Sequence, residues 1–424
     1  MNLLIKGGRV IDPANKIDKV MDLLIEKGKI SRMAGSIRSE NCRVIDAAGL
    51  IVVPGLIDMH THLREPGRED EETILSGSEA AVKGGFTSIC AMPNTSPAVD
   101  KEAVVKLILS KAEQAGLVNV YPIGAITKGR EGRELAEIGE LKRAGVVALS
   151  DDGNPVENSR IMRRALEYSR MFDLPIIAHC EDKNFSAGGM INEGRISTVL
   201  GLKGIPCFSE ENMVARDVSL AKLTGSRIHI AHISSAGSVR IIKQAKKDGI
   251  NVTAEATPHH FSLSDENLRL FDTNYKVNPP LRTGQDIDAI KKALADGTID
   301  AIATDHAPHS EEEKDVEFDY APFGMTGLET ALGLAIKELV EKRILTVSRL
   351  VEKMSLNPAR ILRLDKGRLD PGSDGDLTII DLNKEWTVKK EDFKSKSKNS
   401  PFIGEKLKGI AAMTICRGKV VYEK

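Results

Sequence analysis

The chain has 424 residues and is 41% hydrophobic, a globular composition with length for two or three domains. Lys and Arg number 60 against 61 Asp and Glu, a net charge of −1, so no charge excess favours nucleic acid or an anionic membrane. No stretch approaches about 18 consecutive apolar residues, which argues against a membrane-spanning helix. Five widely spaced cysteines without a CxxC pair argue against a disulfide framework and predict a reducing, cytoplasmic environment.

Both ends of the chain are predicted to be β-structure. Short apolar runs broken by turn-forming pairs such as Gly-Gly and Asp-Pro fill the first fifty residues. The end of the chain repeats this pattern around the turn cluster GRLDPGSDG. Because the two ends of a domain often lie close together, we expect residues 1–53 and 359–424 to form one small discontinuous β-sandwich.

Between these ends, residues 54–358 alternate short apolar runs with amphipathic stretches of ten residues or more, the pattern of a parallel sheet with crossover helices. Strands are expected at 51–57, 87–91, 119–123, 146–149, 176–178, 227–231, 251–254 and 299–303. Helices are expected at 72–83, 101–114, 134–143, 158–171, 213–223, 238–247 and 327–341. Eight such strands predict an α/β fold, the (β/α)₈ barrel. A doubly wound open sheet is the alternative, weakened because no glycine-rich phosphate loop follows an early strand.

Two long segments interrupt this alternation. Residues 182–209 follow the fifth predicted strand, and residues 306–323 follow the eighth. The second segment contains the acidic run EEEKDVEFD, which is either a solvated loop or a lid over the barrel mouth.

Side chains that are costly to bury recur where successive predicted strands end, and in a barrel that end is the catalytic face. His60 and His62 are two residues apart on a strand, so they project to the same side and can hold one metal ion. Further candidates follow the fourth, fifth, sixth and eighth strands: Asp152, His179, His232 and Asp305. Four histidines and two carboxylates suit a borderline divalent cation such as Zn²⁺.

Metal-assisted hydrolysis is the chemistry that this set predicts. A divalent metal lowers the pKa of its bound water to about 7 and polarises a carbonyl, so the expected nucleophile is metal-bound hydroxide. Asp305 is expected to take the proton and return it to the leaving nitrogen as general acid and base. Neither a GxSxG nucleophile motif nor a Walker A motif occurs.

Four neighbouring residues have a plainer interpretation. His229, His259 and His260 are predicted to be packed histidines or to orient metal ligands. Alternation along the strand points Cys180 away from the ligand face, which predicts a buried, inert thiol. The open alternative is that the Cys180 thiolate reaches the zinc and inhibits the enzyme.

Characteristic motifs occur in order along the chain: VPGLIDMHTHLREPG, AMPNTSP, SDDG, AHCED, AHISS, ATPHH, KVNPPLR, TDHAPH and APFGMTGLET. In this order they resemble the class I dihydroorotases of the amidohydrolase superfamily, over essentially the whole chain. The resemblance implies a zinc-dependent, reversible interconversion of N-carbamoyl-L-aspartate and L-dihydroorotate in de novo pyrimidine (UMP) biosynthesis.

The resemblance also implies the metal ligands. They are His60, His62 and Asp305 for one metal, Asp152 as a bridge, and His179 and His232 for a second metal. Hydantoinases and allantoinases carry a carboxylated lysine at the bridge, whereas this chain has the motif SDDG there. Choosing Asp152 over Asp151 rests on the family pattern, and one or two zinc ions per subunit remain open.

A substrate carboxylate is expected to meet Arg64. This residue lies two positions after His62, faces the same side if the strand continues, and offers a bidentate guanidinium. The resemblance adds the substrate contacts His62, Asn94, Asn278 and His309, with the backbone of Phe323 and Gly324 against the ring.

Three further interpretations stay open. The chain could be another cyclic amidase, such as an allantoinase or a hydantoinase (dihydropyrimidinase). It could be a catalytically impaired homologue that scaffolds a partner enzyme. The resemblance also allows a complex with aspartate carbamoyltransferase, and a homo-oligomer is compatible with the sequence.

Overall fold

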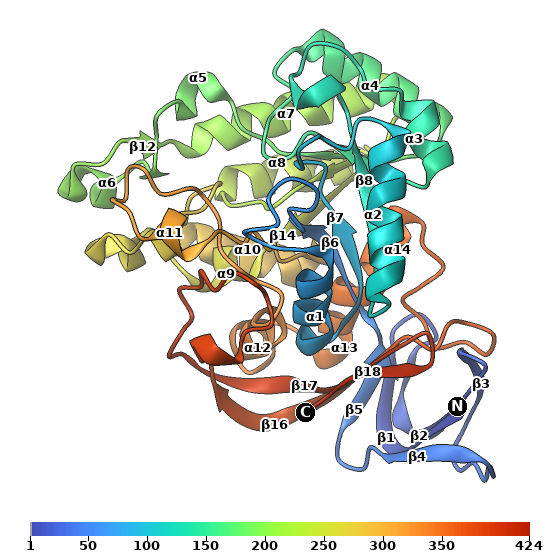
Figure 1. The fold of residues 1–424 in the computed structure, drawn as a ribbon. Coiled ribbons are helices and arrows are strands. Elements are labelled where there is room, and N and C mark those ends of the chain that lie inside the picture. The colour runs from blue at the N-terminus through green and yellow to red at the C-terminus, as the bar shows by residue number, and fades with distance from the viewer. Residues whose placement is uncertain (1) are drawn as a thin grey trace.

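The alternating apolar runs in the middle of the chain form a parallel sheet in the computed structural model, which describes residues 2–424 (Figure 1). Met1, the first residue of the predicted β-sandwich segment, lies outside the described residues. Eight strands pair in the order β15-β14-β13-β10-β9-β8-β7-β6. They are β6 (Leu56–Thr61), β7 (Phe86–Ala91), β8 (Asn119–Ala125), β9 (Ala148–Ser150), β10 (Ile176–Ala178), β13 (Ile228–Ile230), β14 (Val252–Ala256) and β15 (Ala301–Ile302).

The sheet curls until its last strand approaches its first. Thr61 and His306 form a parallel bridge, and the His62 N–H donates to the His306 carbonyl at 2.9 Å. The predicted α/β barrel is therefore confirmed, in a nearly closed form.

Helices cover the outside of the barrel (Figure 1). They are α1 (Ile74–Gly84), α2 (Glu102–Ala115), α3 (Ile138–Ala144), α4 (Ser159–Met171), α7 (Cys207–Thr224), α8 (Ala236–Lys247), α10 (Gly284–Asp296), α12 (Ala331–Ala335), η4 (Ile336–Val340), α13 (Val347–Val351), η5 (Glu352–Leu356) and α14 (Asn357–Leu362). Among the described residues, no helix is long and apolar enough to cross a membrane.

Helix α10 is absent from the predicted elements. Its first turn carries a capping box, in which the Thr283 side chain accepts from the Asp286 N–H and the Asp286 side chain accepts from the Thr283 N–H. This S/T-x-x-acid pattern before an apolar run is the signal that could have located the helix.

The two long insertions contain only short elements. The first, at 182–209, holds α5 (Lys183–Ser186), β11 (Ile191–Asn192), α6 (Arg195–Leu200) and β12 (Gly204–Ile205). The second, at 306–323, holds α11 (Glu311–Lys314). Other short elements in the barrel loops are η1 (Lys128–Arg130), α9 (Pro258–Ser262), η2 (Asp265–Leu270) and η3 (Thr273–Tyr275).

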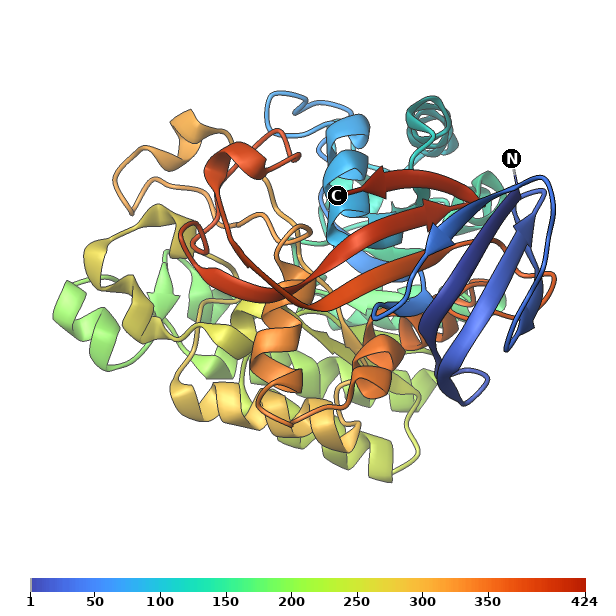
Figure 2. The same cartoon turned by 90° about the horizontal axis from the view of Figure 1, so that it is seen from below.

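Strands from both ends of the chain form a second, mixed sheet (Figure 2). Its order is β18-β17-β16-β5-β1-β2-β3, with β4 paired to β1. The strands are β1 (Asn2–Asp12), β2 (Ile17–Glu26), β3 (Lys29–Ala34), β4 (Cys42–Asp46), β5 (Ile51–Pro54), β16 (Leu377–Thr387), β17 (Lys406–Cys416) and β18 (Lys419–Glu423). The expectation that both ends combine is confirmed, whereas the exact boundaries at 53 and 358 stay predictions.

The predicted strand 51–57 is in fact two strands that belong to different sheets. The chain passes from β5 in the mixed sheet to β6 in the barrel at Gly55. A Cβ atom at this position would lie 2.0 Å from the Thr87 hydroxyl, so only glycine lets the two sheets approach this closely.

The connection between β16 and β17 leaves the mixed sheet. It includes η6 (Lys390–Asp392) and runs beside the barrel toward α9 and α11 before returning (Figure 1). A segment from the C-terminal end of the chain therefore reaches the loops around the barrel mouth.

Candidate active site

The predicted site residues gather in one cavity of about 360 Å³ at the carboxyl ends of the barrel strands. Those that line it are His62, Arg64, Asn94, Asp152, His179, His232, Asn278, Asp305, His309, Phe323 and Gly324. His60 is fully buried beside this cavity, next to Asp152 and Asp305. Cys180 is the one candidate placed elsewhere.

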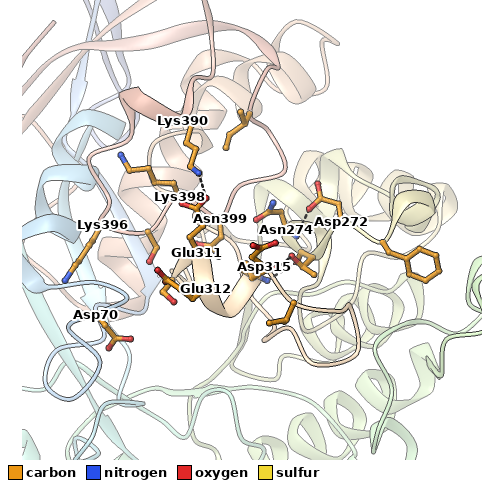
Figure 3. Close-up of a pocket in the computed structure, with 17 residues that line it drawn as sticks. Asp70, Asp272, Asn274, Glu311, Glu312, Asp315, Lys390, Lys396, Lys398 and Asn399 are labelled. Atoms are coloured by element: carbon orange, nitrogen blue, oxygen red, sulfur yellow. Dashed lines mark hydrogen bonds and ion pairs between the residues drawn. The ribbon is translucent and has the colours of Figure 1, made fainter.

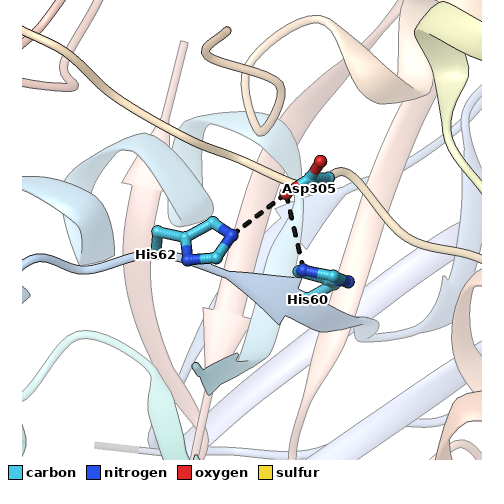
Figure 4. A group of neighbouring side chains, drawn as sticks. All are labelled: His60, His62 and Asp305. Carbon is cyan, nitrogen blue, oxygen red and sulfur yellow. Dashed lines mark hydrogen bonds and ion pairs between the residues drawn. The ribbon is translucent and has the colours of Figure 1, made fainter. Parts of the chain in front are cut away.

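His60, His62 and Asp305 form a first group of metal-ligating atoms (Figure 4). His60 lies on β6 and His62 directly follows its last residue, so the alternation of an extended chain turns both histidines to the same side. Asp305 Oδ1 lies 3.4 Å from His60 Nε2 and 3.1 Å from His62 Nε2. Ligand atoms about 2.0–2.1 Å from a tetrahedral zinc ion lie about 3.3 Å from one another, so these separations suit a shared metal ion.

Asp152, His179 and His232 form a second group that adjoins the first. Asp152 Oδ1 is 3.5 Å from both His179 Nδ1 and His232 Nε2, and these two nitrogens are 2.9 Å apart. The same oxygen is 3.4 Å from His60 Nε2. The Asp152 carboxylate thus lies between the two groups, where a bridging ligand would stand.

Three of the imidazoles have a hydrogen-bond acceptor on the side that points away from the site, and this acceptor determines which ring nitrogen faces the site. His60 Nδ1 lies 2.8 Å from Glu255, His62 Nδ1 lies 2.7 Å from the Asn94 side-chain oxygen, and His179 Nε2 lies 3.2 Å from Glu181. A metal-bound imidazole is neutral and carries one N–H, which it would donate to such an acceptor. The lone pairs of His60 Nε2, His62 Nε2 and His179 Nδ1 would then be directed at the site, as metal ligation requires.

Two of these inward atoms lack a hydrogen-bond partner. Among the described residues, His60 Nε2 and Asp152 Oδ1 are buried without one. An unsatisfied buried polar atom costs about 1–3 kcal/mol, and a bound cation would satisfy both atoms. The residues therefore fit a divalent metal ion.

The carboxylates of the site are held ionised. Burial raises the pKa of Glu255, but hydrogen bonds from His229 and His60 outweigh it and lower the value to about 2. Burial likewise opposes charge on Asp152 and Asp305, yet the neighbouring histidines hold the pKa of both well below the usual range. All three groups are anionic at neutral pH.

Three residues of the site have left-handed backbone conformations. The φ angles are +61° at Arg64, +31° at His232 and +49° at Asp305. Non-glycine residues in this region cost about 1 kcal/mol or more and concentrate at functional sites. The turns that aim these side chains into the cavity are therefore maintained by the surrounding fold.

The structure separates the two aspartates of the SDDG motif. Asp151 Oδ1 accepts hydrogen bonds from the N–H groups of Ile126 and Thr127 at 2.8 and 3.0 Å. The Asp151 carboxylate thus holds the loop after β8 in place, and of the two aspartates only Asp152 faces the histidines.

Arg64 and His309 lie side by side in the wall of the same cavity. Arg64 Nε lies 2.9 Å from Glu71 and 3.1 Å from the Pro308 carbonyl, and Arg64 Nη2 is 3.2 Å from His309 Nε2. His309 Nδ1 lies 2.7 Å from Glu71. Burial and the positive charges of Arg64 and Lys314 lower the pKa of His309 to about 3, so a neutral imidazole stands beside the guanidinium.

Cys180 packs away from the cavity in the largest hydrophobic cluster. Its thiol lies 3.7 Å from Asp217, and burial raises its pKa well above the usual value. This is the placement expected of an inert thiol, and inhibitory zinc ligation by Cys180 stays a prediction without support from this geometry.

The remaining histidines support their neighbours. His229 Nε2 lies 3.1 Å from Glu255, and His229 Nδ1 lies 2.8 Å from the Thr253 hydroxyl. His260 lies between the Thr257 hydroxyl and the Pro279 carbonyl. His259 is buried, and its ring lies 4.4 Å from that of His260.

Sequence reasoning missed three acidic residues that orient the predicted ones: Glu71, Glu181 and Glu255. Glu255 had a detectable signal, because an acidic residue inside a short buried strand such as VTAEA is costly unless it has a partner. Glu181 follows His179 by two residues within the AHCED motif, so its position was visible but its role was not recognised. Glu71 lies in a loop and bonds His309 from a distant part of the chain, so no local pattern marks it.

Glu255→Gln is expected to weaken metal binding by about 10- to 100-fold, the range for residues that orient metal-bound histidines. The amide would present its NH₂ group or a weaker acceptor to His60, and Nε2 would lose its fixed lone pair. Titration with a competing chelator measures the affinity. Thr253→Val is the control, because it removes only the Thr253 contact to His229 and should retain wild-type affinity.

This combination of features defines a class of protein. A nearly closed parallel barrel with a His/Asp metal site at its strand ends, joined to a mixed sheet, is the arrangement of a metal-dependent amidohydrolase. Two family models match the chain, "Dihydro-orotase-like" over residues 49–238 and "Amidohydrolase family" over residues 223–422.

Full-length relatives identify the member of this class. Dihydroorotases from Pelotomaculum thermopropionicum and Syntrophus aciditrophicus are 58% and 55% identical, each over 100% of this chain and 99% and 100% of theirs. The chain belongs to the dihydroorotase family of cyclic amidohydrolases.

Solved structures show the same fold. The L-hydantoinase (dihydropyrimidinase) from Arthrobacter aurescens has a TM-score of 0.89 at 28% identity, covering 100% of this chain and 96% of that one. A D-hydantoinase from Thermus sp. has a TM-score of 0.82 at 25% identity, covering 99% and 95%.

Proposed function

We propose that this dihydroorotase is a zinc enzyme that interconverts N-carbamoyl-L-aspartate and L-dihydroorotate in pyrimidine biosynthesis. One observation carries the proposal. Six ligand atoms from four histidines and two aspartates lie together, with neighbouring atoms 2.9–3.5 Å apart, at a cavity that Arg64 also lines. Imidazole and carboxylate donors at tetrahedral spacing favour zinc.

Asp305 is the proposed general acid and base. When bound, the metal would lower the pKa of a water molecule and polarise the amide carbonyl. Asp305 Oδ1 is engaged with His60 and His62, which leaves Oδ2 to accept the proton of the attacking water. In ring opening the same oxygen returns that proton to the departing ring nitrogen, and ring closure reverses the transfer.

Arg64 is the proposed partner of the substrate carboxylate. Glu71 and the Pro308 carbonyl hold its Nε, and His309 Nε2 lies 3.2 Å from its Nη2, so the guanidinium is fixed before substrate arrives and Nη1 is left for the ligand. His309 contributes from the same side.

The ring of the substrate is proposed to be held by Asn94, Asn278 and the backbone of Phe323 and Gly324. After bonding His62 and Glu181, the two asparagine side chains each have a polar group left to bind it.

Arg64→Gln is expected to raise KM for dihydroorotate about 100-fold with a smaller change in kcat, because truncating one partner of a buried charge pair costs about 2–5 kcal/mol. Steady-state kinetics with dihydroorotate measure the effect. Arg163→Gln is the control: Arg163 is exposed on α4, does not line the cavity and pairs with Glu167. An unchanged KM in Arg64→Gln would contradict the assignment.

The deciding experiment is metal analysis coupled to turnover. The purified protein should contain one or two zinc ions and turn over dihydroorotate in preference to allantoin and hydantoins assayed side by side. Faster turnover of a hydantoin would favour the cyclic-amidase alternative. Absence of turnover with zinc, alone and with aspartate carbamoyltransferase present, would favour the scaffolding alternative.

Two further proposals concern the surroundings of the enzyme. A complex with aspartate carbamoyltransferase rests on the family resemblance and is tested by co-elution of the two proteins, which also reports whether this chain self-associates. A cytoplasmic location is supported by the five cysteines, all of which are free thiols.

A further inference from the structure

A segment near the C-terminal end of the chain packs against the loops around the opening of the barrel. Residues 394–399, here called the clasp segment, lie in the connection between β16 and β17. Figure 3 shows Lys396, Lys398 and Asn399 of this segment around one pocket that Glu311 and Glu312 of α11 also line. The clasp segment therefore belongs to the mixed-sheet part of the chain but contacts the loop that follows the last barrel strand.

Hydrogen bonds attach the clasp segment to the loop that carries Glu71 and Glu72. The Ser395 hydroxyl and the Lys396 N–H donate to the buried Glu72 carboxylate, the latter at 3.1 Å. The Ser397 hydroxyl donates to the Glu71 carbonyl at 2.6 Å. Glu71 in turn contacts both Arg64 and His309, so this attachment bears on the proposed carboxylate site.

Asn399 is the residue of the clasp segment whose side chain bonds both sides of the 306–323 insertion. The residue is 5% exposed, and its side-chain NH₂ group donates to the carbonyls of Ala307 and Gly324 at 3.2 and 3.1 Å. Its side-chain oxygen accepts from the His309 N–H at 3.1 Å. Both donors and the acceptor of the amide are therefore used.

These three bonds join the two ends of the 306–323 insertion. His309 lies near its start, and Phe323 and Gly324 lie at its end. The ends approach so closely that a Cβ atom on Gly324 would lie 2.8 Å from the Ala307 Cβ and 3.0 Å from the His309 ring. The Asn399 amide satisfies the carbonyl groups of both ends, which would otherwise be buried without a partner.

We propose that Asn399 is a positioning residue for substrate binding, through which the mixed-sheet part of the chain sets the spacing between His309 and the Phe323–Gly324 backbone. The inference rests on the proposed function, because it deepens the assignment of these residues as substrate contacts. None of the three hydrogen bonds of the Asn399 side chain goes to a predicted metal ligand. Its loss should therefore affect substrate affinity and leave the metal centre intact.

The test compares Asn399→Ala and Asn399→Asp with the wild-type enzyme. The aspartate keeps the shape and the acceptor for the His309 N–H but loses both donors. In each variant KM for dihydroorotate should rise about tenfold or more, since displacement of a binding group by about 1 Å can cost up to 100-fold. The value of kcat should change less than about threefold, and the zinc content should match that of the wild type.

Ser355→Ala is the matched control. Ser355 is also buried, and its hydroxyl donates to the Gly55 carbonyl at 2.8 Å, where β5 meets β6. Losing this bond should lower the melting temperature without changing KM, which separates general destabilisation from positioning.

Two outcomes have distinct meanings. A folded Asn399 variant with wild-type KM, whatever its melting temperature, would overturn the positioning role, and if the alanine variant does not fold, the isosteric aspartate variant decides. A wild-type enzyme that does not turn over dihydroorotate would instead contradict the proposed function.

Discussion

Asp305→Asn should lower kcat for dihydroorotate about 10³- to 10⁴-fold, since general acid–base groups contribute up to about 10⁴-fold and Asp305 is also a proposed metal ligand. The amide has the same size as the carboxylate and keeps an oxygen for the first metal group. It cannot accept a proton at neutral pH, so both directions of the reaction should slow together. Steady-state kinetics in both directions, with zinc analysis of the same sample, measure the effect.

A matched variant for this experiment is Asp300→Asn. Asp300 lies just before β15, whereas Asp305 follows the strand, and it bonds Lys246 and the Ala254 N–H at 2.6 and 2.9 Å. Its substitution should reduce stability and spare kcat. If Asp305→Asn retained kcat within tenfold of the wild type with zinc bound, another group would have to be the acid and base.

Asp152→Ala should remove metal from the site and abolish measurable activity, whereas Asp151→Ala should retain both. Asp152 Oδ1 lies within 3.5 Å of His60, His179 and His232, so its loss leaves both ligand groups without their shared carboxylate. Elemental analysis after dialysis should show at least one zinc fewer per subunit in Asp152→Ala than in the wild type.

The Asp151→Ala variant should instead be less stable by about 2 kcal/mol, because it leaves the buried N–H groups of Ile126 and Thr127 unpaired. Denaturant unfolding followed by fluorescence or circular dichroism measures this loss. Loss of zinc from Asp151→Ala and retention in Asp152→Ala would reverse the assignment of the two residues.

The fold could be predicted from local patterns. A barrel strand is a short apolar run and the helix that follows it is amphipathic, and both patterns can be read along the sequence. The missed helix α10 had the same kind of local signal, a capping box at Thr283 before the buried apolar positions Ile290 and Leu294. The junction at Gly55 also escaped notice, because β5 and β6 are one continuous apolar run whose division depends on two sheets that meet in space.

The candidate site was predictable to the extent that ligands sit at strand ends in a repeating topology. The pairing of His60 with His62 follows from the two-residue period of a strand. By contrast, Glu255 orients His60 and His229 from another strand, and Asn399 joins loops about 75 to 92 residues away. Such contacts depend on how the whole chain packs and leave no periodic signal.

The sequence by itself determined the class of fold, the strand ends that carry histidine and aspartate, and, through its motifs, the family. These properties follow from hydrophobic periodicity and from residue types that are costly to bury without a function. The tertiary structure alone decided that Asp151 bonds the loop after β8, that Cys180 faces Asp217, and that the C-terminal clasp segment bonds the loops of the barrel mouth. The physical reason is the same in each case: hydrogen bonds between side chains far apart in sequence form only after the barrel closes and the mixed sheet packs against it.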